Sequence, residues 1–205
     1  MSTPSYPLAL PSTPNFVTSS FQISRKTGYT ESPFTGKQQV HEYPYALWKA
    51  VLTLPPIRKA DWNNWAVFVL QLRGKRGTFL LGDPDATTEG TATGTILTDG
   101  TTNAGATQVS LNGFSNTGTI KKGDYLQIGA NGSNTLHLVT ADATASGGAL
   151  VCHFEPSVSV AVANDTSVIF GANAKGIFRM DADAYGWEAN AVSTYGFTFS
   201  CTQAY

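Results

Sequence analysis

The chain has 205 residues, of which 41% are hydrophobic and 13% charged, and its formal net charge is −1. This composition supports a buried core in one domain or two small ones and excludes a disordered chain. It also excludes a broad basic surface for nucleic-acid phosphates, and because no apolar run approaches the ~20 residues of a membrane-spanning helix, we expect a soluble protein without membrane insertion.

The N-terminal region combines a proline-rich segment, a strand and a polar hairpin. Prolines at positions 4, 7, 11 and 14 favour an extended segment of the kind that often reaches a neighbouring subunit. No signal peptide is expected in the first fourteen residues. Residues 16–23 (FVTSSFQI) predict a first strand, and residues 24–45 predict a wide hairpin with both faces exposed to water. Such a hairpin typically lines a channel or docks on a partner. Its candidate contact residues are Lys26, Tyr29, Lys37, Gln38 and Gln39.

A strand, a helix and a second strand follow, and the rest of the chain is organised around them. Residues 46–54 (ALWKAVLTL) alternate between the two faces of a strand, which Pro55 and Pro56 end. Apolar residues at spacings of three and four predict an amphipathic helix at about residues 59–73, with Gly74 as its left-handed cap. Residues 77–82 (GTFLLG) predict the second strand. The core residues expected from this unit and the C-terminal strand are Trp48, Leu52, Trp62, Trp65, Ala66, Val69, Leu70, Phe79, Phe197 and Phe199.

Residues 86–173 differ in composition from the chain on either side. They are rich in Thr, Gly, Ala, Ser and Asn. Short strands are predicted at residues 107–111, 125–128, 135–139, 149–154 and 167–170, which indicates a small barrel or sandwich. The earlier pattern returns in residues 175–181 and in the regularly alternating residues 195–202.

The predicted fold is therefore mainly β. A β-sandwich with one packed helix is expected from residues 1–85 plus 174–205, called the body. A small inserted β-barrel or β-sandwich domain is expected from residues 86–173, called the insert.

Residues of the types that carry catalysis or bind metals do not converge in the sequence. His41, His137 and His153 lack metal-ligand spacing, and the run 181–186 (DADAYG) resembles a calcium loop but has Val192 where a bidentate glutamate is needed. The carboxylates in residues 82–85 are typical of a turn. We therefore expect no catalytic, cofactor-binding or metal site. Cys152 and Cys201 are expected to be buried free thiols, with a disulfide as the alternative.

Exposed aromatic residues can stack on sugars and so form a carbohydrate platform. Three of the four tryptophans belong to the strand and helix unit and are expected in the core, which leaves Trp187. The insert has no tryptophan, and its Phe114, Tyr125, Phe154 and Phe170 offer little support for a carbohydrate platform.

Several segments of the body occur in an order that carries a resemblance. They are Gly28-Tyr29 before the polar hairpin, LTLPP at residues 52–56, Arg73-Gly74 at the helix end, RGTFLLGDPD at residues 76–85 and YGFTFSCTQAY at residues 195–205. In these segments the chain resembles distal tail proteins of long-tailed bacteriophages, in particular the lambda-type minor tail protein M group. The family pattern lacks the insert, in which KKGDYLQIG (residues 121–129) is similar to inserts of phage tail proteins.

The resemblance implies a structural, non-enzymatic virion protein that is assembled in the host cytoplasm. It would form a homohexameric ring at the distal end of the tail, and its partners would be the tail tube protein, the tip hub and neighbouring minor tail proteins. DNA would pass through the ring without sequence-specific binding. A second hypothesis is a carbohydrate- or receptor-binding accessory module of a phage tail tip, with host-surface glycan bound through the insert. A third, a small hydrolase, would need a carboxylate pair or metal cluster that the sequence does not offer.

Overall fold

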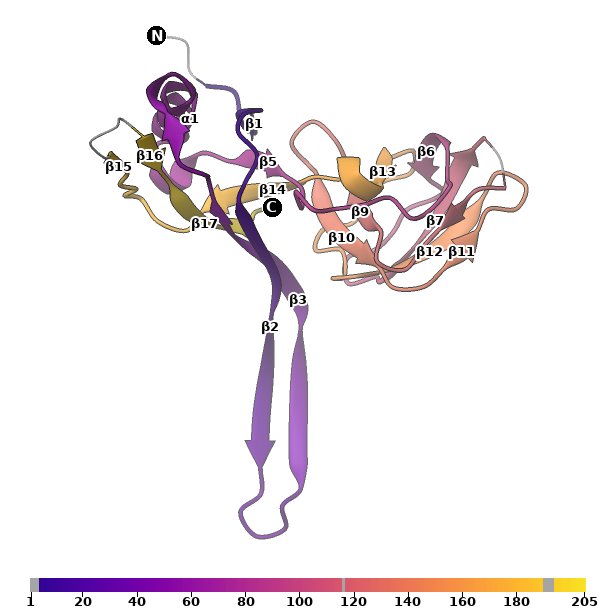
Figure 1. The fold of residues 1–205 in the computed structure, drawn as a ribbon. Helices are drawn as coiled ribbons and strands as arrows, with labels where there is room; N and C mark the ends of the chain where they lie inside the picture. Colours follow the sequence, from indigo (N-terminus) through magenta and orange to yellow (C-terminus); the bar gives the residue numbers. More distant parts are fainter. Residues whose placement is uncertain (1–3, 116, 190–193) are drawn as a thin grey trace.

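The protein folds mainly into β-structure. The computed structural model describes residues 4–115, 117–189 and 194–205, with 46% of residues in strands and 10% in helices. Two six-stranded sheets that share no strand make up most of it, together with the one α-helix of the described residues (Figure 1). The predicted mainly β fold with a single packed helix is confirmed.

The first sheet lies in the body and joins strands from both ends of the chain. In spatial order it contains β1 (Leu8–Ala9), β5 (Phe79–Leu81), β14 (Gly176–Met180), β17 (Thr198–Gln203), β3 (Gln38–Thr53) and β2 (Thr18–Glu31). β1 pairs parallel with β5, and the other neighbours pair antiparallel. A small sheet of β15 (Glu188–Ala189), β16 (Thr194–Gly196) and β4 (Ile57–Arg58) lies beside the helix, where Tyr195 stacks on Trp62.

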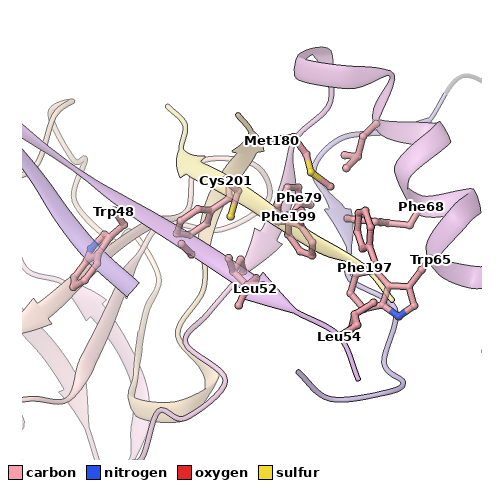
Figure 2. Close-up of a cluster of buried hydrophobic side chains, with 14 of the residues drawn as sticks. Trp48, Leu52, Leu54, Trp65, Phe68, Phe79, Met180, Phe197, Phe199 and Cys201 are labelled. Carbon is pink, nitrogen blue, oxygen red and sulfur yellow. The ribbon is translucent and has the colours of Figure 1, made fainter. Parts of the chain in front are cut away.

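The helix α1 (Lys59–Leu72) packs its aromatic face on the body sheet. Trp62, Trp65, Phe68 and Leu72 are buried, and Figure 2 shows Trp65 and Phe68 close to Phe197 and Phe199. The helix ends at Leu72 and is capped by Arg73, whose φ of 52° is left-handed, one residue before the expected cap. Gly74 is also left-handed, with φ 68°, and begins the short 3-10 helix η1 (Gly74–Arg76).

Most residues expected in the core lie there, and one does not. Trp48, Leu52, Trp62, Trp65, Phe79, Phe197 and Phe199 are buried, and Ala66 and Val69 pack half-buried against the same cluster. The placement of Leu70 in the core is wrong, because its side chain is 68% exposed. Positions two apart on a helix differ by roughly 200° around the axis, so Leu70 and the buried Leu72 cannot share a face. Phe68, one turn before Leu72, takes the core position instead.

The proline-rich N-terminal segment packs on its own body. From Leu8 it pairs with β5, and the hydroxyl of Tyr6 donates a 2.7 Å hydrogen bond to the carbonyl of Gln71. Farther along, the carbonyl of Thr13 accepts a 3.0 Å hydrogen bond from the indole N–H of Trp65. Tyr6, Leu8 and Thr13 therefore have partners within the same chain.

The second sheet lies within the insert and curls into a nearly closed barrel. Its order is β13 (Val168–Phe170), β9 (Tyr125–Ile128), β10 (Thr135–Val139), β12 (Leu150–Glu155), β7 (Gln108–Phe114) and β6 (Gly94–Thr98). A bridge between Leu97 and Ser167 brings β6 beside β13. The short strands β8 (Thr119–Ile120) and β11 (Ala143–Thr144) pair separately, and the 3-10 helix η2 (Gly171–Asn173) leads back to the body.

The insert leaves and re-enters the body at adjacent points. Leu81 at the end of β5 lies opposite Gly176 at the start of β14. Close by, the indole N–H of Trp48 donates a 2.9 Å hydrogen bond to the carbonyl of Leu136, and the ring of Tyr125 lies 5.8 Å from that of Trp48. Leu136 belongs to the same buried cluster as the body core, so the insert covers one end of the body.

Candidate functional site

The polar hairpin predicted at residues 24–45 is built by the outer parts of β2 and β3. The two strands pair as far as Glu31 and Gln38, with an irregularity between Arg25 and Thr27. The loop at residues 32–37 is closed by a 2.9 Å hydrogen bond from the amide of Ser32 to the carbonyl of Lys37. Among the described residues no third strand pairs with this outer part, which projects away from the body (Figure 1). Residues 26–43 are called the arm.

The five predicted contact residues all lie on the arm, and all are exposed: Lys26, Tyr29, Lys37, Gln38 and Gln39. The hydrogen bond from the hydroxyl of Tyr29 to Glu31 raises the pKa of that hydroxyl. Gln38 lies opposite Glu31, and Gln39 lies opposite Thr30. Because neighbouring positions of a strand point to opposite faces, the two glutamines lie on opposite faces of the arm. The structure therefore brings the five residues together on one projection without forming a pocket between them.

The arm also carries apolar side chains that sequence reasoning missed. Phe34 at the tip is 95% exposed, and Val40 and Tyr43 are exposed as well. Val40 lies directly opposite Tyr29, so the two form one apolar pair on one face. The signal for Phe34 was available, because a phenylalanine between Pro33 and Gly36 sits in a turn that a two-stranded hairpin cannot cover. Exposed apolar side chains at the tip and on a face of a projecting hairpin are candidates for contact with a partner.

The base of the arm is fixed by a charged cluster. Arg25 forms a 2.7 Å ion pair with Glu155 of the insert and a 3.3 Å ion pair with Glu42 of the arm. These residues line a hollow of about 270 Å³ between the arm and the insert. Since all three side chains are more than a third exposed, the ion pairs contribute little to stability and act mainly to orient the arm.

A second exposed apolar surface lies along the C-terminal half of α1. It is a groove of about 330 Å³, called the helix groove, and its lining residues are Val69, Leu70, Leu72, Arg73, Gly74, Met180, Asp183, Ala184, Tyr185 and Trp187. Trp187 is 45% exposed and rests against Trp62, with ring centres 5.1 Å apart. The carboxylate of Asp183 accepts a 2.9 Å hydrogen bond from the amide of Lys75, which holds one wall of the groove on the helix end.

The titratable side chains in the interior have structural partners. The two ring nitrogens of His137 contact the carbonyl of Pro156 at 2.6 Å and the hydroxyl of Thr135 at 2.9 Å, and burial lowers the pKa of His137 to about 4. The hydroxyl of Tyr125 donates a 2.7 Å hydrogen bond to Asp83, and burial together with this bond raises its pKa far above its usual value. Asp83 also accepts the amide of Asp85, as expected for a turn.

The two thiols are buried apart from each other, and the carboxylates do not gather with them or with histidines. Cys152 and Cys201 are buried free thiols in separate cores, and burial raises the pKa of each. The described residues contain no group of three or more His, Cys, Asp or Glu side chains that could hold a metal ion. Val192, which bears on the calcium-loop comparison, lies outside the described residues.

The aromatic residues considered for a glycan platform in the insert are not displayed on its surface. Phe114 and Phe154 are buried in the barrel core, and Phe170 packs half-buried against it. Tyr125 faces the body, where it contacts Trp48 and Asp83. Their placement agrees with the expectation that these four residues offer little support for a carbohydrate platform.

In comparisons with protein-family models and with curated proteins, no match to the chain is found. Within the part of the chain that the structure describes, no helix combines the length and apolarity required to cross a membrane.

Proposed function

We propose that the chain is a structural protein of the virion of a long-tailed phage. It forms a ring at the distal end of the tail, joins the tail tube to the tip hub and leaves a channel for DNA. The observation that carries this proposal is the arm, an ordered hairpin with exposed side chains on both faces and an exposed phenylalanine at its tip.

The arm gains little side-chain burial in the single chain. Fixing one residue of backbone costs about 1–2 kcal/mol, and an isolated two-stranded hairpin is only marginally stable. Most of its side chains beyond the ion pairs of Arg25 bury little surface. A partner that covers Tyr29, Phe34 and Val40 would supply the missing burial, which is what a ring-forming connector requires.

The charges of the arm fit a surface beside a DNA channel. Its charged residues are Lys26, Lys37, Glu31 and Glu42, so the two positive charges equal the two negative ones. A surface without net positive charge does not hold phosphates, and DNA would slide past it.

Three of the five segments that carry the resemblance come together in one sheet of the body. Residues 52–56 end β3, residues 76–85 contain β5, and residues 195–205 contain β17. β17 pairs with β3, and β14 alone separates it from β5. The resemblance therefore rests on one compact part of the fold, from which the arm projects.

The test is the mass of the purified full-length chain by light scattering, followed by negative-stain imaging of the same peak. We expect a hexameric mass and six-fold rings with an open lumen. A monomeric mass over the whole accessible concentration range, with no rings on the grid, would count against the proposal.

A further inference from the structure

The tip of the arm and the helix groove are exposed apolar surfaces at opposite ends of the body. In Figure 1 the arm points away from α1, so the arm of a chain does not reach its own groove. Phe34 is 95% exposed at one end, and Leu70 is 68% exposed at the other. Each surface therefore lacks a cover in the single chain, and each has the chemistry to cover the other.

The charges beside the two surfaces are complementary. Glu31 and Lys37 flank the loop that carries Phe34, one on each side. Arg73 and Asp183 belong to the lining of the helix groove and are both exposed. The tip and the groove therefore each carry one positive and one negative charge. If the two surfaces docked, pairing of opposite charges would favour a single orientation of the tip.

We infer that the arm of one copy docks on the helix groove of a second copy, with Phe34 between Leu70 and Trp187, Glu31 toward Arg73 and Lys37 toward Asp183. This inference rests on the proposed function, since it names the contact through which neighbouring subunits of the ring join. The contact is head-to-tail, because it uses different surfaces of the two copies. Repeating it around an axis closes a ring.

A contact with one aromatic anchor is weak between two free chains, so the experiment traps it covalently. Full-length Thr35→Cys and Ala184→Cys variants, which keep Phe34, Leu70 and Trp187, carry different affinity tags and are mixed with oxidised glutathione as the oxidant. Both replaced residues are exposed, Thr35 beside Phe34 on the tip and Ala184 in the lining of the helix groove. The native Cys152 and Cys201 are buried and form few thiolates. The matched control pairs Ala184→Cys with Val160→Cys, since Val160 is a 65% exposed apolar residue on the insert.

We expect the Thr35–Ala184 pair to give the mixed disulfide about tenfold faster than the control pair, because docking through Phe34 raises the effective concentration of the two thiols. Equal rates for the two pairs would overturn the inference.

The orientation is tested by reversing charges on the same trapping pair. Adding Glu31→Arg to the arm variant, or Arg73→Glu to the groove variant, should slow trapping several-fold, and combining the two should restore it. Failure of the combination to restore the rate would overturn the stated orientation.

The two proposals fail separately. Rings of the unmodified chain without selective trapping would leave the ring standing and overturn the contact. Selective trapping without rings would support the contact and count against the ring.

Discussion

Two leucines on α1 show how one helical position decides whether a side chain stabilises the fold. Leu72 is 1% exposed and Leu70 is 68% exposed. We expect Leu72→Ala to lower the free energy of unfolding by about 2–5 kcal/mol, since it leaves a cavity in the core. Leu70→Ala should change it by less than about 0.5 kcal/mol. Urea unfolding of both variants at low protein concentration measures this, and equal losses would contradict the assignment of the buried face.

His137 makes folding stability depend on pH. The carbonyl of Pro156 only accepts, so the Nδ1–H of the neutral ring donates to it, and the hydroxyl of Thr135 lies at Nε2. Burial lowers the pKa of His137 from 6.5 to about 4. Between these values the unfolded chain binds a proton that the folded chain does not, so stability falls as the pH falls from 6.5 to about 4.

The expected loss from this group is roughly 3 kcal/mol over that window, with no further loss from it at lower pH. The measurement is the free energy of unfolding across the window for the unmodified chain and for His137→Gln. Other titrating groups contribute equally to both curves and cancel in the difference between them. That difference should shrink as the pH falls, because only the unmodified chain loses the contribution of His137. Parallel curves would show that His137 does not contribute.

Local sequence patterns predicted the positions of the strands and the helix better than they predicted what these elements pack against. The strands β9 and β10 have the predicted bounds, and α1 ends one residue before the predicted limit. β6 was missed because only Ile96 and Thr98 are buried in a run of Thr and Gly, which lacks a clear alternation. The packing of the N-terminal segment on the body could not be predicted, because prolines indicate an extended chain but not what it packs on.

The arm is an element whose removal should leave the fold intact. Replacing residues 27–42 with Asn-Gly, which favours a tight hairpin turn, keeps the pairing of β2 with β3 near the body. We expect an unchanged circular dichroism spectrum and a melting temperature within a few degrees, since the arm buries little surface.

The same deletion should abolish the proposed hexameric rings. A variant that keeps the arm but carries Phe34→Ser and Val40→Ser is the matched control, since it removes apolar surface without shortening the hairpin. Light scattering on the three proteins measures the effect. Rings from the armless variant would show that the arm is not the subunit contact.

For the whole molecule, the two exposed surfaces were predictable to different degrees. The arm was visible in the sequence, because turn residues and alternating polar residues define a hairpin locally. The helix groove was not, since Trp187 and Leu70 are far apart in the chain and line the same groove only in the folded structure. Recognition of the groove also required the correct helical face, which the spacing of apolar residues alone left ambiguous.

The junction between body and insert supports a last prediction. Because Leu81 lies opposite Gly176, replacing residues 82–175 with Asn-Gly would join β5 and β14 as an ordinary hairpin. We expect the joined body to fold, with a lower free energy of unfolding than the full chain, because Trp48 loses the carbonyl of Leu136 and the ring of Tyr125.

The excised insert, residues 86–173, should fold as well, since its barrel has a core of its own. Thermal unfolding of the joined body, the excised insert and the full chain measures the coupling between them. Trp48→Phe in the full chain is the matched control, because it removes the hydrogen bond to Leu136 while keeping an aromatic ring, at a cost of about 1–3 kcal/mol. If the joined body were as stable as the full chain, the buried contact through Trp48 would contribute nothing. The insert would then not stabilise the body. A markedly lower free energy of unfolding for the joined body would instead show that the insert stabilises the sheet that carries the arm.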